Sequence, residues 1–413
     1  MMKQTLVSEI STWNVFKWIL LFVVFISLKP WILWEFDNPL IISLIVLVSS
    51  FFAHVLFSFR IKNILLMIIF FLLARFGATR GNFNSFLATF LYSIPLIVFI
   101  GLKDKYKIEF LFFFTKTFSL ILGISLIGWI LYLVGVNLPH NSITYGYSEI
   151  RDEEQYFFDN YYFFLVNKGF SGMSDLFLTR FSSIFIEPGH ISVVIVLLLH
   201  IHNYDFKNKY VIFLFCSLLF TFSLAGYLLC LFSFFAYLLQ KSKKRIFGII
   251  IFVFSIWCIQ LFFTNYNDGN NLINQLIFER LKFDDNKFIS GNNRDFEQVS
   301  DYFYMHFLKS NDFLMGFDIY KIFGDTSSVS WKVYLMRYGL LGLFLLLLFW
   351  IQVAKSYKCY ESYIIMFLYM FIFVQTSHFV FWSIFPIIFI SGCAHAKMKD
   401  KRIKRLLLTH EYS

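Results

Sequence analysis

Runs of apolar residues recur along this 413-residue chain, and most are long enough to cross a lipid bilayer. A helix needs about 20 mostly apolar residues to span the hydrocarbon. Hydrophobic residues make up 58% of the sequence, and its mean hydropathy is +0.67. A soluble domain cannot bury so many such runs. The sequence therefore predicts an all-α polytopic membrane protein that lies in the lipid bilayer.

The apolar windows predict about twelve transmembrane helices in a single membrane domain that covers residues 1–413. We expect them near residues 14–34, 39–59, 63–78, 84–102, 109–136, 187–205, 209–223, 225–240, 246–264, 333–353, 361–377 and 379–396. The first run continues without a small-residue cleavage site. We therefore expect a retained helix there rather than a signal peptide.

Two long polar stretches, residues 137–187 and 265–332, interrupt the apolar pattern. Lysine and arginine gather in the short connections and the tail, at 60–62, 103–107, 207–209, 241–245, 355–358 and 397–405. The positive-inside rule places these segments, and both termini, on the cytoplasmic side. The two polar stretches are then external loops, which we expect to contain short helices and to face one site. We attribute the net charge of +10 to these cytoplasmic lysines and arginines, so no nucleic acid is expected as a partner.

The first loop ends in Arg180 and, seven residues later, in Glu187-Pro188-Gly189-His190. Proline suits the first turn of a helix, and a carboxylate before it is favourable at the positive helix end. A purely structural role is therefore one interpretation. The other is a binding site, because ionisable groups at a membrane interface are costly and tend to mark function.

The second loop contains Arg294, followed by apolar residues at helical spacing. Phe296, Val299, Phe303, His306 and Phe307 recur at helical spacing and predict an amphipathic helix from about 295 to 310, on the membrane surface or beneath the first loop. Arg294 is either an exposed charge or a phosphate ligand.

Arg337 is expected about one helical turn inside the tenth predicted span, where an unpaired guanidinium would be costly. We expect it to face an anionic group. Arg75 and Arg80 lie on the external side and are either further phosphate ligands or charges that reach toward water. No nucleophile triad, P-loop or zinc motif is present in the sequence, and we predict no metal or cofactor.

In the order of these features the chain resembles the O-antigen and capsular polysaccharide polymerases (Wzy-type) of the O-antigen ligase/polymerase superfamily. The resemblance covers most of the chain and includes the two external loops before the sixth and tenth spans. Its motifs are Arg180 with Glu187-Pro188, the small-residue break from Ser223 to Gly226, Asn293-Arg294, Gly316, and the Tyr338-Gly339-Leu-Leu-Gly342 exit. It implies a helical architecture similar to the GT-C type.

The resemblance implies a metal-independent glycosyltransferase of the bacterial cytoplasmic (inner) membrane. Such an enzyme moves a glycan from one undecaprenyl diphosphate carrier onto a carrier-linked oligosaccharide repeat unit, and a chain-length regulator is a further candidate partner. Glu187 is the first choice to accept the acceptor hydroxyl's proton or hold the acceptor sugar, and Asp325 is the second. The expected substrate-binding residues are Arg180, Arg294 and Arg337 for the diphosphate, with Arg75, Arg80, His190 and Tyr338.

Three alternatives remain open. The O-antigen ligase branch is expected to have a histidine eleven residues before Gly339, where this chain has Ser328. A flippase or other transporter of lipid-linked oligosaccharides would have short loops and ionisable residues at the bilayer midplane. A membrane acyltransferase would need a histidine site open to the cytosol, for which His200 and His202 are the nearest candidates. We therefore favour the polymerase.

Overall fold

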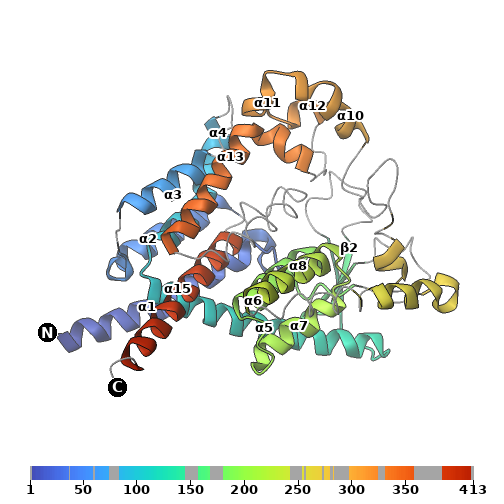
Figure 1. Cartoon of the computed structure of the whole chain (residues 1–413), viewed down its shortest axis with the longest axis horizontal. Coiled ribbons are helices and arrows are strands. Elements are labelled where there is room, and N and C mark those ends of the chain that lie inside the picture. The colour runs from blue at the N-terminus through green and yellow to red at the C-terminus, as the bar shows by residue number, and fades with distance from the viewer. Residues whose placement is uncertain are drawn as a thin grey trace. The chain divides into compact units, whose positions relative to one another are not determined.

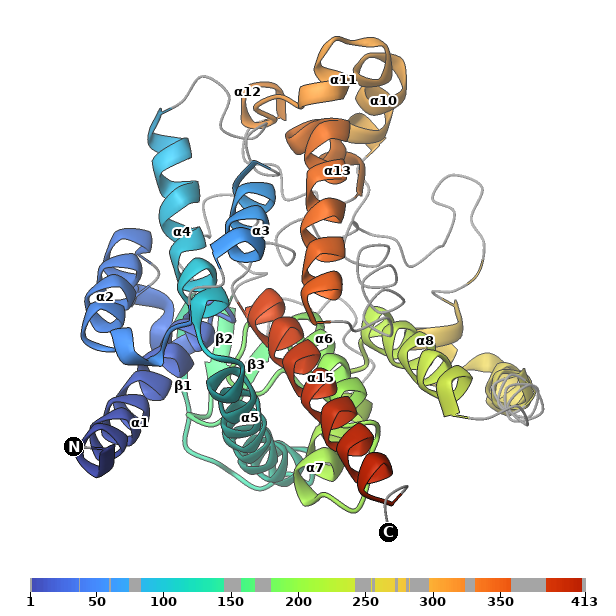
Figure 2. The same cartoon turned by 60° about the vertical axis from the view of Figure 1, so that its left-hand side comes forward.

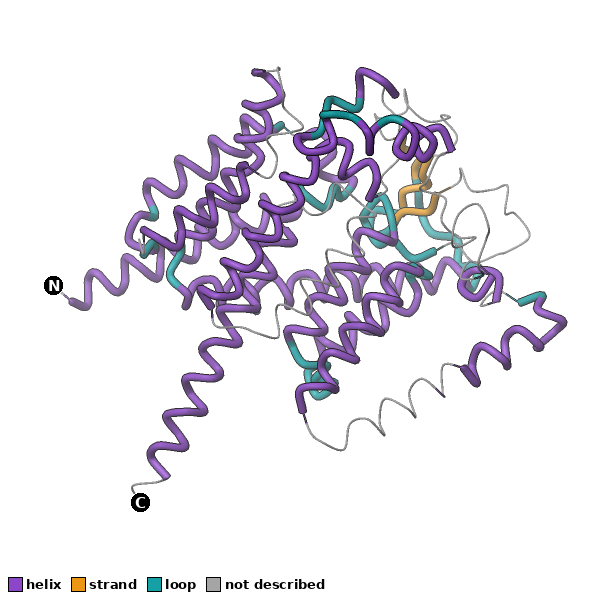
Figure 3. Tube along the Cα trace, turned by 45° about the horizontal axis from the view of Figure 1, so that its top comes forward, coloured by secondary structure: helices purple, strands orange, loops and turns teal. Residues whose placement is uncertain are grey.

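The computed structural model describes residues 2–36, 38–58, 61–73, 83–144, 157–167, 180–241, 254, 257–271, 274–279, 282, 297–323, 331–357 and 384–410. Helices dominate these residues, and the strands form one small sheet (Figure 3). The chain divides into two compact units. The first comprises residues 1–118, 301–324 and 331–413, and the second comprises 119–300 and 325–330. The single membrane domain stays a prediction.

The first unit is helical in its described residues. It contains α1 (Met2–Ile26), η1 (Trp31–Phe36), α2 (Pro39–Phe52), η2 (His54–Leu56), α3 (Ile61–Leu73), α4 (Phe83–Gly101), the start of α5 (Asp104–Leu133), the end of α10 (Glu297–Met305), η9 (Phe307–Lys309), α11 (Asp312–Met315), α12 (Tyr320–Phe323), α13 (Trp331–Tyr357) and α15 (Ile384–His410). Helix α2 packs against α4, and α3 packs against α13 (Figure 2).

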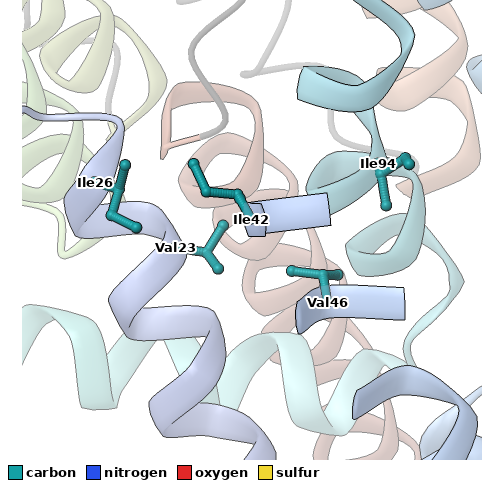
Figure 4. Close-up of a cluster of buried hydrophobic side chains, with 5 residues drawn as sticks. All are labelled: Val23, Ile26, Ile42, Val46 and Ile94. Carbon is teal, nitrogen blue, oxygen red and sulfur yellow. The ribbon is translucent and has the colours of Figure 1, made fainter. Parts of the chain in front are cut away.

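Branched aliphatic side chains hold the first helices of this unit together. Val23 and Ile26 of α1 meet Ile42 and Val46 of α2 and Ile94 of α4, all at most 6% exposed (Figure 4). The five positions come from three separate apolar runs. The cluster therefore aligns these helices through packing, and Ser43 Oγ of α2 also donates to the Leu91 carbonyl oxygen of α4 at 2.7 Å.

The second unit continues α5 and adds a small sheet and a helical hairpin. Its elements are β1 (Asn141–Thr144), β2 (Phe157–Asn160), β3 (Leu165–Asn167), α6 (Pro188–Ile201), α7 (Lys209–Phe220), α8 (Leu224–Lys241), η6 (Tyr266–Gly269) and η7 (Asn274–Phe278). The three strands are antiparallel in the order β1-β2-β3. Helix α6 packs against both α7 and α8 (Figure 1).

The described residues confirm a mostly helical protein with helices suited to a membrane. Within them, Glu9–Ile26, Asp104–Leu133 and Trp331–Tyr357 are long and apolar enough to cross a bilayer, and several shorter apolar helices accompany them. The count of about twelve spans and the GT-C-type architecture stay predictions. The span expected at 361–377 lies outside the described residues.

The two external loops differ from each other in structure. Short helices are confirmed in the second loop, where α10, α11 and α12 form. In the first loop the prediction of short helices was wrong for the described residues, which form the β1–β3 sheet. Its strands carry aromatic and β-branched residues, such as Phe157, Phe158 and Val166, which favour extended backbone.

Charged contacts join four segments at one end of the first unit. Lys103 Nζ lies 3.1 Å from Glu9 Oε1, and Lys397 Nζ lies 3.3 Å from Asp104 Oδ2. Lys397 Nζ also donates to the Ser356 carbonyl oxygen at 3.5 Å. The sequence predicts that all four segments lie on the same side of the membrane, and their contact agrees with that prediction. That this face is cytoplasmic stays a prediction.

Candidate functional site

A sharp break between α7 and α8 brings two helix beginnings together in the second unit. Ser223 caps α8, because its Oγ accepts a hydrogen bond from the Gly226 N–H at 3.3 Å. Ser192, in the second turn of α6, has its Oγ 3.1 Å from Ser223 Oγ. A Cβ at Gly226 would lie 2.5 Å from the Ser192 Cβ, so only glycine permits this approach. The small-residue break predicted from Ser223 to Gly226 lies between α7 and α8, and it brings the N-terminal ends of α6 and α8 together.

Arg180 is held at this break by the backbone. Its Nε donates to the Thr221 carbonyl oxygen at 3.2 Å, and the Phe181 N–H donates to the Phe220 carbonyl oxygen at 3.0 Å. The arginine side chain is half-buried. The guanidinium is therefore fixed beside the start of α8, where the helix dipole also favours a negative charge.

Glu187 and His190 lie at the start of α6. Pro188 occupies the first helical position, as the sequence predicted. The Glu187 carboxylate makes no capping bond to the helix. Its Oε2 lies 3.4 Å from His190 Nε2 instead, with the glutamate side chain 42% exposed and the histidine 14% exposed. A carboxylate and an imidazole are thus paired at the same end of the unit as Arg180.

Arg337 and Tyr338 lie in the first unit, just before a kink in α13. Gly339 has φ 67° and ψ 176°, which breaks α13 into two helices. A Cβ at Gly339 would lie 2.4 Å from the Leu314 carbonyl oxygen, and one at Gly316 would lie 2.6 Å from the Arg337 carbonyl oxygen. Arg337 lies in the second turn of α13, near the position that the sequence predicted, and the break at Gly339 follows two residues later. The helix before the break is short, because the two glycine backbones pack against each other there.

The short helix before Gly339 also carries a buried cation that was not predicted from the sequence. Lys332 is 7% exposed, and its Nζ lies 4.8 Å from the centre of the Tyr304 ring. The Arg337 guanidinium lies 5.7 Å from the centre of the Tyr338 ring, which is itself 5% exposed. A lysine at the predicted external end of a span departs from the positive-inside rule, and this departure could have identified Lys332 from the sequence.

The amphipathic helix of the second loop is confirmed in part. Val299, Phe303 and Phe307 are at most 2% exposed, as their helical spacing predicted. The α-helix ends at Met305, and a 3-10 turn continues it.

The predicted site residues divide into three sets. Arg180, Glu187 and His190 lie in the second unit, and Arg337 and Tyr338 lie in the first. That the two sets face one ligand stays a prediction. Arg75, Arg80, Arg294 and Asp325 lie outside the described residues.

Comparisons with protein-family models, with curated proteins and with solved structures find no match to this chain.

Proposed function

We propose that this protein is a membrane glycosyltransferase that polymerises lipid-linked oligosaccharide repeat units. It would transfer a glycan from one undecaprenyl diphosphate carrier to a sugar hydroxyl on another carrier-linked repeat, at the external face of a bacterial inner membrane. The observation that carries the proposal is the arrangement at the α6/α8 end of the second unit. There a backbone-held arginine, two helix N-termini and a carboxylate–imidazole pair lie at one end of the same helix pair.

Arginine and helix N-termini are both suited to a diphosphate. The guanidinium can donate in a fork to phosphate oxygens without a metal ion. Helix N-termini present backbone N–H groups and the positive end of the dipole to an anion. Because Arg180 Nε is already bonded to Thr221, the orientation of the rest of the group is restricted before a ligand binds. This preorganisation is what transition-state stabilisation needs.

The proposed reaction has a simple balance of bonds and charge. The acceptor hydroxyl oxygen forms a bond to the anomeric carbon of the donor glycan. The bond from that carbon to the diphosphate oxygen breaks, and undecaprenyl diphosphate leaves with the electron pair. The hydroxyl proton passes to the Glu187–His190 pair, and Arg180 stabilises the charge that grows on the leaving group. Arg337, on its kinked helix, is proposed as a second diphosphate ligand.

Substitution of Arg180 tests the proposal in cells. We expect Arg180→Ala to abolish long polymer while single repeat units accumulate on the carrier, because the leaving group loses its fixed cation. Arg180→Lys should restore only a small part, since a lysine keeps the charge but cannot both bond Thr221 and offer a fork to phosphate. The measurement is the chain-length ladder of the glycan on a gel, together with the mass of the carrier-linked material.

A matched control lies beyond the C-terminal end of α6, away from the candidate site. Lys207 is an exposed cation in the turn between α6 and α7, and Lys207→Ala should leave the ladder unchanged. Wild-type ladders in Arg180→Ala, with the protein inserted at the normal level, would remove Arg180 from the site.

A further inference from the structure

The β2–β3 hairpin extends along the side of α5 rather than over its end. The Tyr161 ring centre lies 5.1 Å from that of Tyr132, near the end of α5. The hairpin's next contacts lie farther down the helix. A Cβ at Gly128 would be 3.1 Å from Phe164 Cε1, and Ser125 Oγ donates to the Phe163 carbonyl oxygen at 2.6 Å.

The part of α5 that the hairpin contacts is apolar enough to lie inside a bilayer. Residues 117–136 contain no Asp, Glu, Lys, Arg or His, and at roughly 1.5 Å per residue they match a hydrocarbon core of about 30 Å. Ser125 lies about 12 Å along the helix axis from Leu133, the last residue of α5. If the core began as early as Phe110, it would end near residue 130, and Ser125 would still lie about 8 Å inside it.

Backbone groups of the hairpin form hydrogen bonds within the protein, as non-helical structure at membrane depth requires. The Tyr161 N–H donates to the Phe164 carbonyl at 3.0 Å, and the Leu165 N–H donates to the Ser183 carbonyl at 2.8 Å. The Ser183 hydroxyl donates to Ser125 Oγ at 2.7 Å, and Ser125 donates in turn to Phe163. This serine chain ties the hairpin, the segment before α6 and the middle of α5 together.

The tip of the hairpin exposes two aromatic side chains. Tyr162 is 50% exposed and Phe163 is 60% exposed, whereas Phe158, Phe164 and Leu165 are 1% exposed. No charged residue occurs from Asn160 to Asn167. An exposed phenylalanine beside a transmembrane helix suits a hydrocarbon surrounding, and a tyrosine adds a hydroxyl that can reach toward the interface.

We infer that the tip of the β2–β3 hairpin, residues 161–164, re-enters the membrane beside α5, and that Tyr162 and Phe163 contact lipid acyl chains. The first loop is then not wholly aqueous, because it places the turn between β2 and β3 among the lipid tails. This inference rests on α5 and the hairpin and does not depend on the proposed enzymatic activity.

Site-directed spin labelling in lipid nanodiscs tests the inference with the full-length chain. Cys216, Cys230, Cys258, Cys359 and Cys393 are first replaced by serine or alanine. Nitroxides are then attached at Phe163→Cys and, as a second reporter, at Tyr162→Cys. The matched control is Phe157→Cys, an aromatic position that is 36% exposed at the far end of the same β-strand from the tip.

We expect the labels at 162 and 163 to collide readily with oxygen, which dissolves in hydrocarbon, and to be shielded from a water-soluble nickel chelate. The label at 157 should show the reverse preference, and a chain-labelled lipid should broaden the signal at 163 but not at 157. Ready access of nickel to the labels at 162 and 163 would overturn the inference in favour of an aqueous loop. Shielding of both labels from oxygen and nickel alike would also overturn it, since a protein surface would then cover the tip.

Discussion

Glu187 and His190 form a candidate base at the start of α6. Glu187 is the extended residue just before the helix, and His190 lies three residues later in the first turn. The structure brings Glu187 Oε2 within 3.4 Å of His190 Nε2. The carboxylate makes no capping bond to α6, and its pairing with the imidazole orients the two groups toward each other.

Substitution of this pair should slow glycan transfer more than it weakens carrier binding. We expect Glu187→Gln and His190→Ala each to lower the transfer rate by roughly 10²-fold or more, the usual contribution of a positioned acid or base. The rate is measured with purified protein, and carrier binding is measured separately. Glu109→Gln changes an exposed glutamate on α5 and should leave both quantities unchanged. A full transfer rate in Glu187→Gln would assign the proton to another group.

At the scale of elements, the close approach of α6 and α8 sets the position of the candidate site. The sequence predicted a break at Ser223 to Gly226, since small residues permit close contact. It could not identify Ser192 as the neighbour, because that contact depends on how α6 packs against α8. The Ser192–Ser223 contact and the absence of a side chain at Gly226 together hold the two helix beginnings beside Arg180.

A double-mutant cycle tests this contact. Gly226→Ala should destabilise the protein by about 1–3 kcal/mol, the usual cost of overpacking, because its Cβ would overlap Ser192. The penalty should fall sharply when Ser192→Gly removes the obstructing atoms. Thermal unfolding in detergent measures each variant. Gly123→Ala is the control, since its Cβ would make an ordinary contact of 3.4 Å with Phe213. An equal penalty in both Ser192 backgrounds would contradict the predicted contact.

The element scale also shows where sequence patterns are insufficient. Apolar runs predicted helices at nearly all the described spans, because burial in lipid imposes helical hydrogen bonding. They did not reveal the kink at Gly339, which depends on the backbone of Gly316 from a distant segment. The β1–β3 sheet was missed because its strands of three or four residues are too short for a recognisable alternation of polar and apolar side chains.

At the scale of the whole molecule, the described residues form mostly helices, several of them suited to a membrane, and the candidate site residues lie near helix ends. Charge patterning predicted that residues 103–107, 355–358 and the two terminal segments share one side of the membrane, and they are in contact in the first unit. Charge patterning cannot say which residues from different loops meet one ligand. That Arg180 and Arg337 bind one ligand stays a prediction, because it depends on long-range packing that no local pattern encodes.

The most direct test of the proposed function is glycan extension by the purified protein in detergent. The substrate is the carrier-linked repeat that accumulates in cells lacking the protein, and products are followed by mass spectrometry. We predict products lengthened by whole repeats, one undecaprenyl diphosphate released for each repeat joined, no requirement for a membrane gradient, and loss of extension in Arg180→Ala. Unchanged substrate in detergent, together with movement of the same lipid across reconstituted vesicles, would contradict the account and identify a transporter.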